Sequence, residues 1–136
     1  MSRREAREIA YKMLFSQDFG GTGWDESDIV NVLDEGQKIG KKDVEFIQSI
    51  LKGVSEHRQE ITSAIERNLQ NYKMNRVLST DMAALKLATF ELFYTDTPAR
   101  IVMNEAIDIV KKYSTEKSFS FVNGVLSKIY KEISNE

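Results

Sequence analysis

The chain has 136 residues, with 41% hydrophobic side chains, a formal net charge of −2 and no cysteine. This length fits one domain with a sizeable core, and the lack of cysteine excludes disulfides, a thiolate nucleophile and Cys-ligated zinc. The charged start has no apolar segment behind it, and no apolar run approaches the roughly 20 residues of a membrane span, so we expect a cytoplasmic protein.

The charges are distributed unevenly along the chain. The segment from Gly21 to Gln37 carries only acidic charges, whereas basic residues gather at the N-terminus and in the last third. These basic residues are Arg3, Arg4, Arg7, Lys12, Lys111, Lys112, Lys117, Lys128 and Lys131. A near-neutral total can therefore hide a basic face that binds nucleic acid.

The first half of the chain predicts three helical segments. Ser2 and Glu5 have the spacing of a capping box, and the helix that they begin should end near Phe19, where a Gly-rich stretch follows (residues 20–23). A short helix is predicted over residues 26–35. A long apolar stripe then runs from residue 44 to Tyr72, and Gly53 inside it marks a point where a kink or break can occur.

The second half predicts three more helices. The first begins at Ser79-Thr80-Asp81, all good N-cap residue types, and is apolar over so much of its surface that it should be central. The next follows Pro98, and the last begins between Ser118 and Ser120. No segment shows the alternation of a half-buried strand. We therefore predict an all-α fold, a single-domain bundle of six to seven helices over residues 1–136.

Catalytic motifs are absent from the sequence. It has no phosphate loop, no GxGxxG and no GxSxG. The Gly-rich residues 20–23 follow a helix and lack the lysine of a phosphate loop, so we interpret them as a connector. The only histidine, His57, lies in a polar run and is expected to be solvated. We expect a protein that is not an enzyme and has no cofactor or metal.

Two carboxylates, Glu91 and Glu105, fall on or beside apolar stripes, where an ionised group is costly unless it is paired. They could form an acid/base or metal site. Alternatively, each could be structural and bind backbone N–H groups or a buried Lys or Arg. A metal would need more oxygen ligands than these two supply, so the structural interpretation is favoured.

The arginines of the first helix also have two interpretations. Arg3 and Arg7 are four residues apart and share a helix face, where like charges repel unless an anion accepts them. Phosphate contact is one explanation, and a solvated face balanced by Glu5 and Glu8 is the other.

Phe119 and Phe121 lie next to Lys117 near the predicted start of the last helix. An aromatic ring beside positive charge at a helix start can stack on bases. A core aromatic or a hydrophobic staple is the alternative, and the residues alone favour it.

Several motifs taken together are similar to those of a known family. They are residues 81–92 (DMAALKLATFEL), Pro98, residues 103–111 (MNEAIDIVK) and residues 121–126 (FVNGVL). With the Arg-rich start and residues 10–15 (AYKMLF), the chain resembles the NusB family of bacterial transcription antitermination factors over essentially its whole length.

The resemblance implies a non-catalytic helical protein that pairs with the ribosomal protein NusE. The pair would bind boxA, a short single-stranded RNA element of ribosomal RNA transcripts, and act on the transcription elongation complex with RNA polymerase. The residues expected to contact RNA are Arg3, Arg4, Arg7, Lys117, Phe119 and Phe121. Of these, Lys117 and Phe119 are expected from the chemistry of their side chains and not from the resemblance. The resemblance maps a protein-partner contact to Asp81, and both a monomer and a homodimer are open.

The chain departs from the family pattern in two places. Tyr72 stands ahead of Arg76 where the family often has Trp, and Lys86 follows Leu85 where a Leu-Arg pair is common.

Two alternative functions stay open. One is an accessory RNA-binding module, like those that precede RNA cytosine methyltransferase domains, and the other is an adaptor whose basic surface binds an acidic protein.

Overall fold

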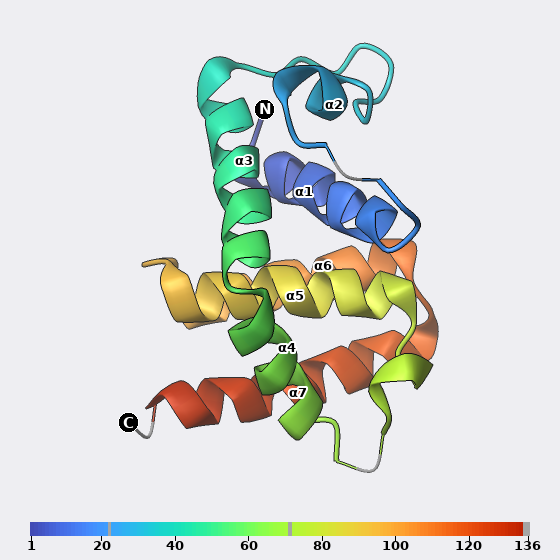
Figure 1. Ribbon diagram of the computed structural model, residues 1–136, viewed down its shortest axis with the longest axis vertical. Coiled ribbons are helices and arrows are strands. Elements are labelled where there is room, and N and C mark those ends of the chain that lie inside the picture. Colours follow the sequence, from blue (N-terminus) through green and yellow to red (C-terminus); the bar gives the residue numbers. More distant parts are fainter. Residues whose placement is uncertain (22, 71, 135–136) are drawn as a thin grey trace.

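The computed structural model describes residues 1–21, 23–70 and 72–134, and these residues form seven α-helices and one 3₁₀ turn with no strand (Figure 1). The elements are, in chain order, α1 (Arg3–Gln17), α2 (Glu26–Val30), α3 (Lys41–Glu56), α4 (Arg58–Arg67), η1 (Met74–Arg76), α5 (Ser79–Tyr94), α6 (Ala99–Tyr113) and α7 (Glu116–Ser134). The predicted all-α bundle is confirmed. Thr22, in the predicted Gly-rich connector, lies outside the described residues.

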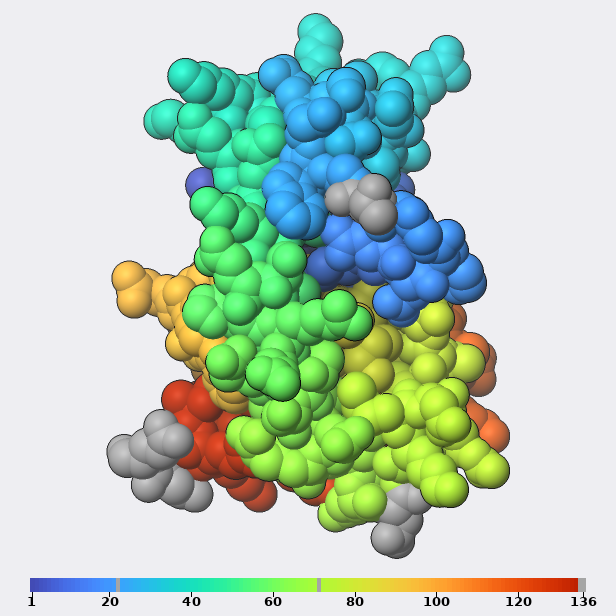
Figure 2. All heavy atoms as spheres, in the orientation of Figure 1, coloured from blue at the N-terminus to red at the C-terminus, as the bar shows by residue number. Residues whose placement is uncertain are grey.

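The central element is α5. It packs against α1, α3, α4, α6 and α7, and α3 and α4 pass over its near face (Figures 1 and 2). Its buried side chains lie on all sides because it is rich in Ala and Leu. The predicted central position is therefore confirmed. Its N-cap, however, is Leu78, and Ser79 already lies inside the helix without capping it.

The first helix begins as its sequence predicts. The Ser2 hydroxyl accepts a hydrogen bond from the Glu5 N–H at 3.1 Å, and the Glu5 carboxylate accepts one from the Ser2 N–H at 3.2 Å. This reciprocal capping box satisfies two N–H groups that have no partner within the helix. The helix ends at Gln17, two residues before the predicted end.

The long third segment consists of two helices, and its break lies at His57 rather than at Gly53. Gly53 lies inside α3, and the ring of Phe90 on α5 occupies the space that a Cβ atom at this position would need. His57 has φ −107° and ψ 24°, outside helical values, and the chain changes direction there. Tyr72 is not part of this stripe, since α4 ends at Arg67.

Two other predicted boundaries were wrong. The second helix ends at Val30, five residues before the expected end. The last helix begins at Glu116, ahead of the expected start, so Phe119 and Phe121 lie inside its first two turns. Over the described residues, no helix is long and apolar enough to cross a membrane.

Candidate nucleic-acid interface

Arg7 is buried at the contact between α1 and α5. Its Nε donates to Glu91 Oε1 at 2.8 Å and one terminal nitrogen donates to Glu91 Oε2 at 3.0 Å. The other terminal nitrogen lies 3.8 Å from Glu105 Oε1. The structural interpretation of Glu91 is thereby confirmed. The anion that Arg7 requires is a carboxylate of its own chain, so Arg7 is turned into the fold and away from solvent.

Arg4 is held by α6 in a similar way, but at the surface. Its Nε donates to Glu105 Oε2 and a terminal nitrogen donates to Asp108 Oδ2, both at 2.9 Å. The hydrogen bond from Arg4 to Glu105, followed by the charges of Glu105 and Asp108, raises the pKa of the Arg4 guanidinium. Glu105 therefore also has a structural partner. Because two carboxylates surround Arg4, the local charge is negative rather than positive.

Arg3 differs from the other two arginines. It is exposed, and its guanidinium lies over the ring of Phe46 on α3, 4.0 Å from the centroid. Arg7 lies over the same ring at 5.5 Å, which confirms that Arg3 and Arg7 share a helix face. Within the described part of the chain, Arg3 has no carboxylate partner. Of the three arginines, it is the one whose charge is free for a phosphate.

Phe119 and Phe121 lie two residues apart on α7 and so point to different sides of the helix. Phe119 is 41% exposed, and Lys111 Nζ of α6 lies 4.7 Å from the centroid of its ring. This arrangement joins an aromatic face to a cation that has no carboxylate partner among the described residues. It can stack a base and attract a phosphate at the same place.

Phe121 faces the linker between α4 and α5. Its ring lies 5.1 Å from that of Tyr72, at an interplanar angle of 43°. The two rings separate two grooves of about 340 and 300 Å³. Lys128 lines one groove, and Lys117 lines the other. An aromatic pair with a lysine on each side has the composition of a single-strand binding surface.

Gly124 lines the groove beside Phe121 and Tyr72. It lies in the interior of α7, where glycine is less favourable than alanine by about 1 kcal/mol. A Cβ atom there would have nothing within 4 Å, so the packing of the chain does not require glycine at this position. A glycine at such a place allows another molecule to approach the helix backbone closely.

Asp81 lies at the start of α5 and lines the same groove as Lys117 and Phe121. It is buried, and its carboxylate accepts a hydrogen bond from the Ser114 hydroxyl at 2.6 Å. Ser114 also contacts the hydroxyl of Ser118 at 2.8 Å. This network ties α5 to the connection between α6 and α7 and to the first turn of α7.

Tyr11 of α1 extends the same network. Its hydroxyl donates to the backbone oxygen of Thr80 at 3.0 Å. Burial, followed by the charge of Asp81 and the nearby Tyr113, raises the pKa of Tyr11 to about 12. The start of α5 is thus held by the first helix and by the α6–α7 connection together.

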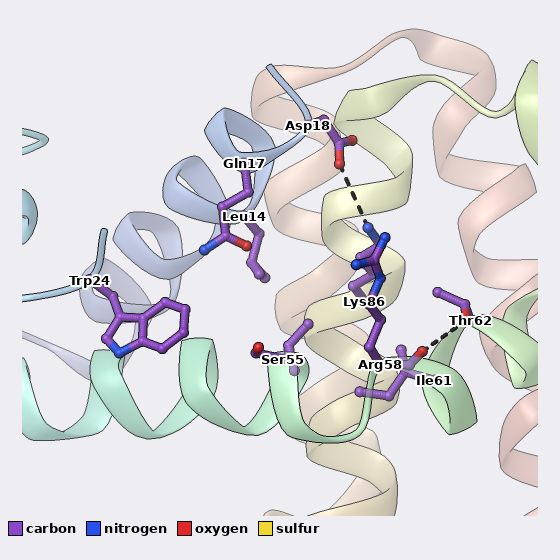
Figure 3. Close-up of a pocket in the computed structure, with 10 residues that line it drawn as sticks. Leu14, Gln17, Asp18, Trp24, Ser55, Arg58, Ile61, Thr62 and Lys86 are labelled. Atoms are coloured by element: carbon purple, nitrogen blue, oxygen red, sulfur yellow. Dashed lines mark hydrogen bonds and ion pairs between the residues drawn. The ribbon is translucent and has the colours of Figure 1, made fainter. Parts of the chain in front are cut away.

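A separate cavity of about 180 Å³ lies between the end of α1, the α3–α4 break and α5 (Figure 3). Leu14 and Ile61 give it apolar walls, and Lys86 reaches across it to Asp18 at 3.6 Å. Lys86, at the position where the family pattern has Arg, therefore joins the central helix to the end of α1.

His57 was expected to be solvated; it is half-buried, and its ring stacks on Tyr94 with centroids 3.7 Å apart at 15°. Among the described residues, no group of three or more His, Asp or Glu side chains is placed to hold a metal ion.

The structure brings Lys117, Phe121 and Asp81 to one groove and places Arg3 and Arg4 on a different element. Sequence reasoning missed two participants, Tyr72 and Gly124. Tyr72 was assigned to a helical stripe, and the family's frequent Trp at that position was the available signal for an exposed ring. Gly124 carried a signal too, because a glycine inside a predicted helix needs a reason.

Comparisons with known proteins cover nearly the whole chain. The model of the NusB family matches residues 4–131. A Clostridium botulinum protein described as transcription antitermination protein NusB is 38% identical over an alignment of 143 positions, gaps included, which covers 95% of this chain and 99% of the relative.

Two solved structures are similar to the whole fold. NusB of T. maritima has a TM-score of 0.83 and 37% identity, covering 97% of this chain and 92% of that one. A chain of the structure described as antitermination factors NusB and NusE in complex with dsRNA has a TM-score of 0.81 and 31% identity, covering 96% of each chain.

Proposed function

This chain belongs to the NusB family, and on that premise we propose that it is a transcription antitermination factor that binds boxA-type single-stranded RNA of ribosomal RNA transcripts together with a NusE protein. The relatives that support the proposal are described as transcription antitermination proteins, and one similar structure is described as NusB and NusE with dsRNA. The proposal includes action on the elongation complex with RNA polymerase, in the cytoplasm, where bacteria transcribe.

The pair formed by Phe121 and Tyr72 is the observation that carries the RNA part of the proposal. Two tilted rings 5.1 Å apart, with a groove on each side, offer faces on which unstacked bases can lie. Such stacking contributes about 1–3 kcal/mol per base and tolerates many sequences. Gly124 beside the rings lets the strand approach the backbone of α7.

Phosphates would be met by cations that have no carboxylate partner among the described residues. These are Arg3 on α1, Lys111 on α6 and Lys117 on α7. Such contacts position the strand without reading its sequence. Arg7 has a supporting role, since its pair with Glu91 fixes α1 against α5. Arg4 binds a phosphate only where that phosphate replaces Glu105 or Asp108 as the partner of its guanidinium.

Asp81 connects the two proposed interfaces. It lines the groove of Phe121 and Lys117, so a protein partner that contacts this end of α5 would lie next to the bound RNA. The partner contact expected of Asp81 is therefore proposed for this end of α5. Because its side chain is buried and accepts a hydrogen bond from Ser114, Asp81 would act there by holding this surface in place. Because one hydrophobic cluster includes residues from α1 to α7, we also propose that residues 1–136 act as a single domain.

The test is fluorescence anisotropy with labelled boxA RNA and a scrambled control, with and without NusE, over a series of salt concentrations. We expect a preference for boxA that increases with NusE and a log–log salt slope of roughly −2 to −3.5, for about three to five phosphates. Light scattering on the same samples gives the oligomeric state that binds, monomer or homodimer. Equal, weak binding of both RNAs by a verified complex with NusE would favour the adaptor and contradict the proposal.

A further inference from the structure

A groove of about 340 Å³ lies between α6 and α7, apart from the grooves beside Phe121. Arg100 and Asn104 of α6 line it, together with Asn123 and Tyr130 of α7. The rest of the lining is apolar and consists of Ala99, Met103 and the buried side chain of Ile107. The groove thus combines a cation, two amides and an aromatic ring.

The two amides belong to the most specific motifs of the sequence. Asn104 is the asparagine of the NEA element, and Asn123 is that of FVNGVL. Both are exposed, and neither makes a side-chain hydrogen bond within the described residues. Packing of the fold therefore gives no reason for asparagine at either place. An asparagine amide carries both a donor and an acceptor, which suits the edge of a nucleobase.

The charge of this groove is also unbalanced. Arg100 has no ion-pair partner in the described part of the chain, and no carboxylate is among the described residues that line the groove. Tyr130 is 41% exposed, so much of its side chain is open to solvent. A free guanidinium next to an exposed ring fits a phosphate followed by a stacked base.

The groove continues the surface that begins at Phe119. Arg100, Asn104, Ile107 and Lys111 follow one another at steps of four, three and four and so share one face of α6. Phe119, Asn123 and Tyr130 share one face of α7 in the same way. Lys111 lies 4.7 Å from the Phe119 ring at one end of this stripe. From Phe119 to Tyr130 the helix rises by about 16 Å, enough for several nucleotides.

We propose that the α6–α7 groove is a second binding site for single-stranded RNA, occupied by the part of the strand that extends beyond Phe119. Tyr130 stacks on a base, Asn104 and Asn123 bind its edge, and Arg100 binds a phosphate. This proposal rests on the RNA-binding function proposed above and deepens it. RNA is favoured over a protein segment because the groove is continuous with the cation and ring of Lys111 and Phe119.

The experiment uses the full chain and a fluorescein-labelled, unstructured single-stranded RNA of about 12 nucleotides, within the range of single-strand site sizes. Tyr130→Ala should raise the Kd about fivefold or more, as expected for the loss of one stacked base. Tyr130→Phe keeps the ring and should bind as the wild type does. Arg100→Gln should reduce the salt slope by about 0.7, the value for one phosphate on a single strand. Lys52→Gln, an equal charge change on the exposed face of α3, should not change the slope.

The outcomes separate this inference from the proposed function. If Phe121→Ala weakens RNA binding while Tyr130→Ala and Arg100→Gln bind normally, the groove is not an RNA site and the proposed function stands. If the wild type binds no RNA even with NusE, both proposals fail. NMR of the side-chain amides gives a second criterion. Shifts of Asn104 and Asn123 on adding RNA support the proposal, whereas shifts caused only by NusE identify a protein contact and overturn it.

Discussion

Arg7 on α1 donates two hydrogen bonds to Glu91 on α5, at 2.8 and 3.0 Å, and both side chains are almost completely buried. The two residues are 84 positions apart in the chain. A bidentate guanidinium–carboxylate pair has a fixed geometry, so it sets the position of the first helix on the central one. Arg7, one of the N-terminal arginines that suggested nucleic-acid binding, therefore stabilises the fold instead.

Removing one partner of this pair should be costly. Glu91→Ala leaves a buried guanidinium without its main counter-charge, and we expect the free energy of unfolding to fall by about 3–5 kcal/mol. Urea unfolding followed by circular dichroism measures this change. Glu56→Ala, which removes a surface partner of Lys52, is the control and should have little effect. Equal effects of the two substitutions would contradict the structural role of Glu91.

Gly53→Ala should destabilise the protein although alanine favours helices. The added methyl group would occupy the place of the Phe90 ring, and α3 would have to move away from α5. We expect a loss of about 1–3 kcal/mol in the free energy of unfolding, typical of an overpacked core. Thermal unfolding of Gly53→Ala with and without Phe90→Leu tests the cause, since a smaller side chain at residue 90 should restore part of the stability.

Gly124→Ala should stabilise the protein but weaken its binding of RNA. Nothing lies within 4 Å of an added Cβ atom, so the variant gains helix propensity of up to about 1 kcal/mol. The same methyl group projects toward the groove of Phe121 and Tyr72 and should raise the Kd for RNA. Unfolding and anisotropy measurements on one preparation check both effects. A stabilised variant with unchanged RNA affinity would show that the strand does not approach α7 here.

Asp108→Asn should strengthen RNA binding. Asp108 accepts a hydrogen bond from Arg4 at 2.9 Å and contributes to the negative charge around this arginine. Its neutralisation leaves Arg4 freer to meet a phosphate, so we expect a lower Kd and a salt slope steeper by up to about 0.7. Asp96→Asn, the same change at an exposed turn, is the matched control. Arg4 makes no phosphate contact if the two variants have the same slope.

The ionisation of Tyr11 should depend on Asp81. Burial and the Asp81 charge raise the pKa of Tyr11 from 10.0 to about 12. A pKa raised on folding adds stability that is complete below about pH 10 and is lost as the pH rises through about 12. In Asp81→Asn the pKa of Tyr11 should decrease, because the negative charge of Asp81, which disfavours the ionised form of Tyr11, is removed. Ultraviolet titration, with Tyr11→Phe to identify the signal, measures the shift.

The helices that could be predicted are those whose signals are local. The capping box of Ser2 and Glu5 and the apolar composition of α5 act within a few residues, so the sequence alone was sufficient for them. The break was expected at Gly53 rather than at His57 because the reason for a glycine at residue 53, the Phe90 ring on another helix, does not show in the local sequence. The structural interpretation of Glu91 and Glu105 followed from the cost of burying a charge, but their partners did not.

The sequence by itself determined the helical class, the family and the types of side chain available for RNA. Helix periodicity, caps and motif order depend on residues that are close in the sequence, so they can be recognised without the structure. Only the tertiary structure decided which cations are free, because an arginine is neutralised by whichever carboxylate the fold brings to it. Arg4 and Arg7 meet acids from distant helices, Arg3 meets an aromatic ring, and Phe121 of α7 meets Tyr72 of the α4–α5 linker.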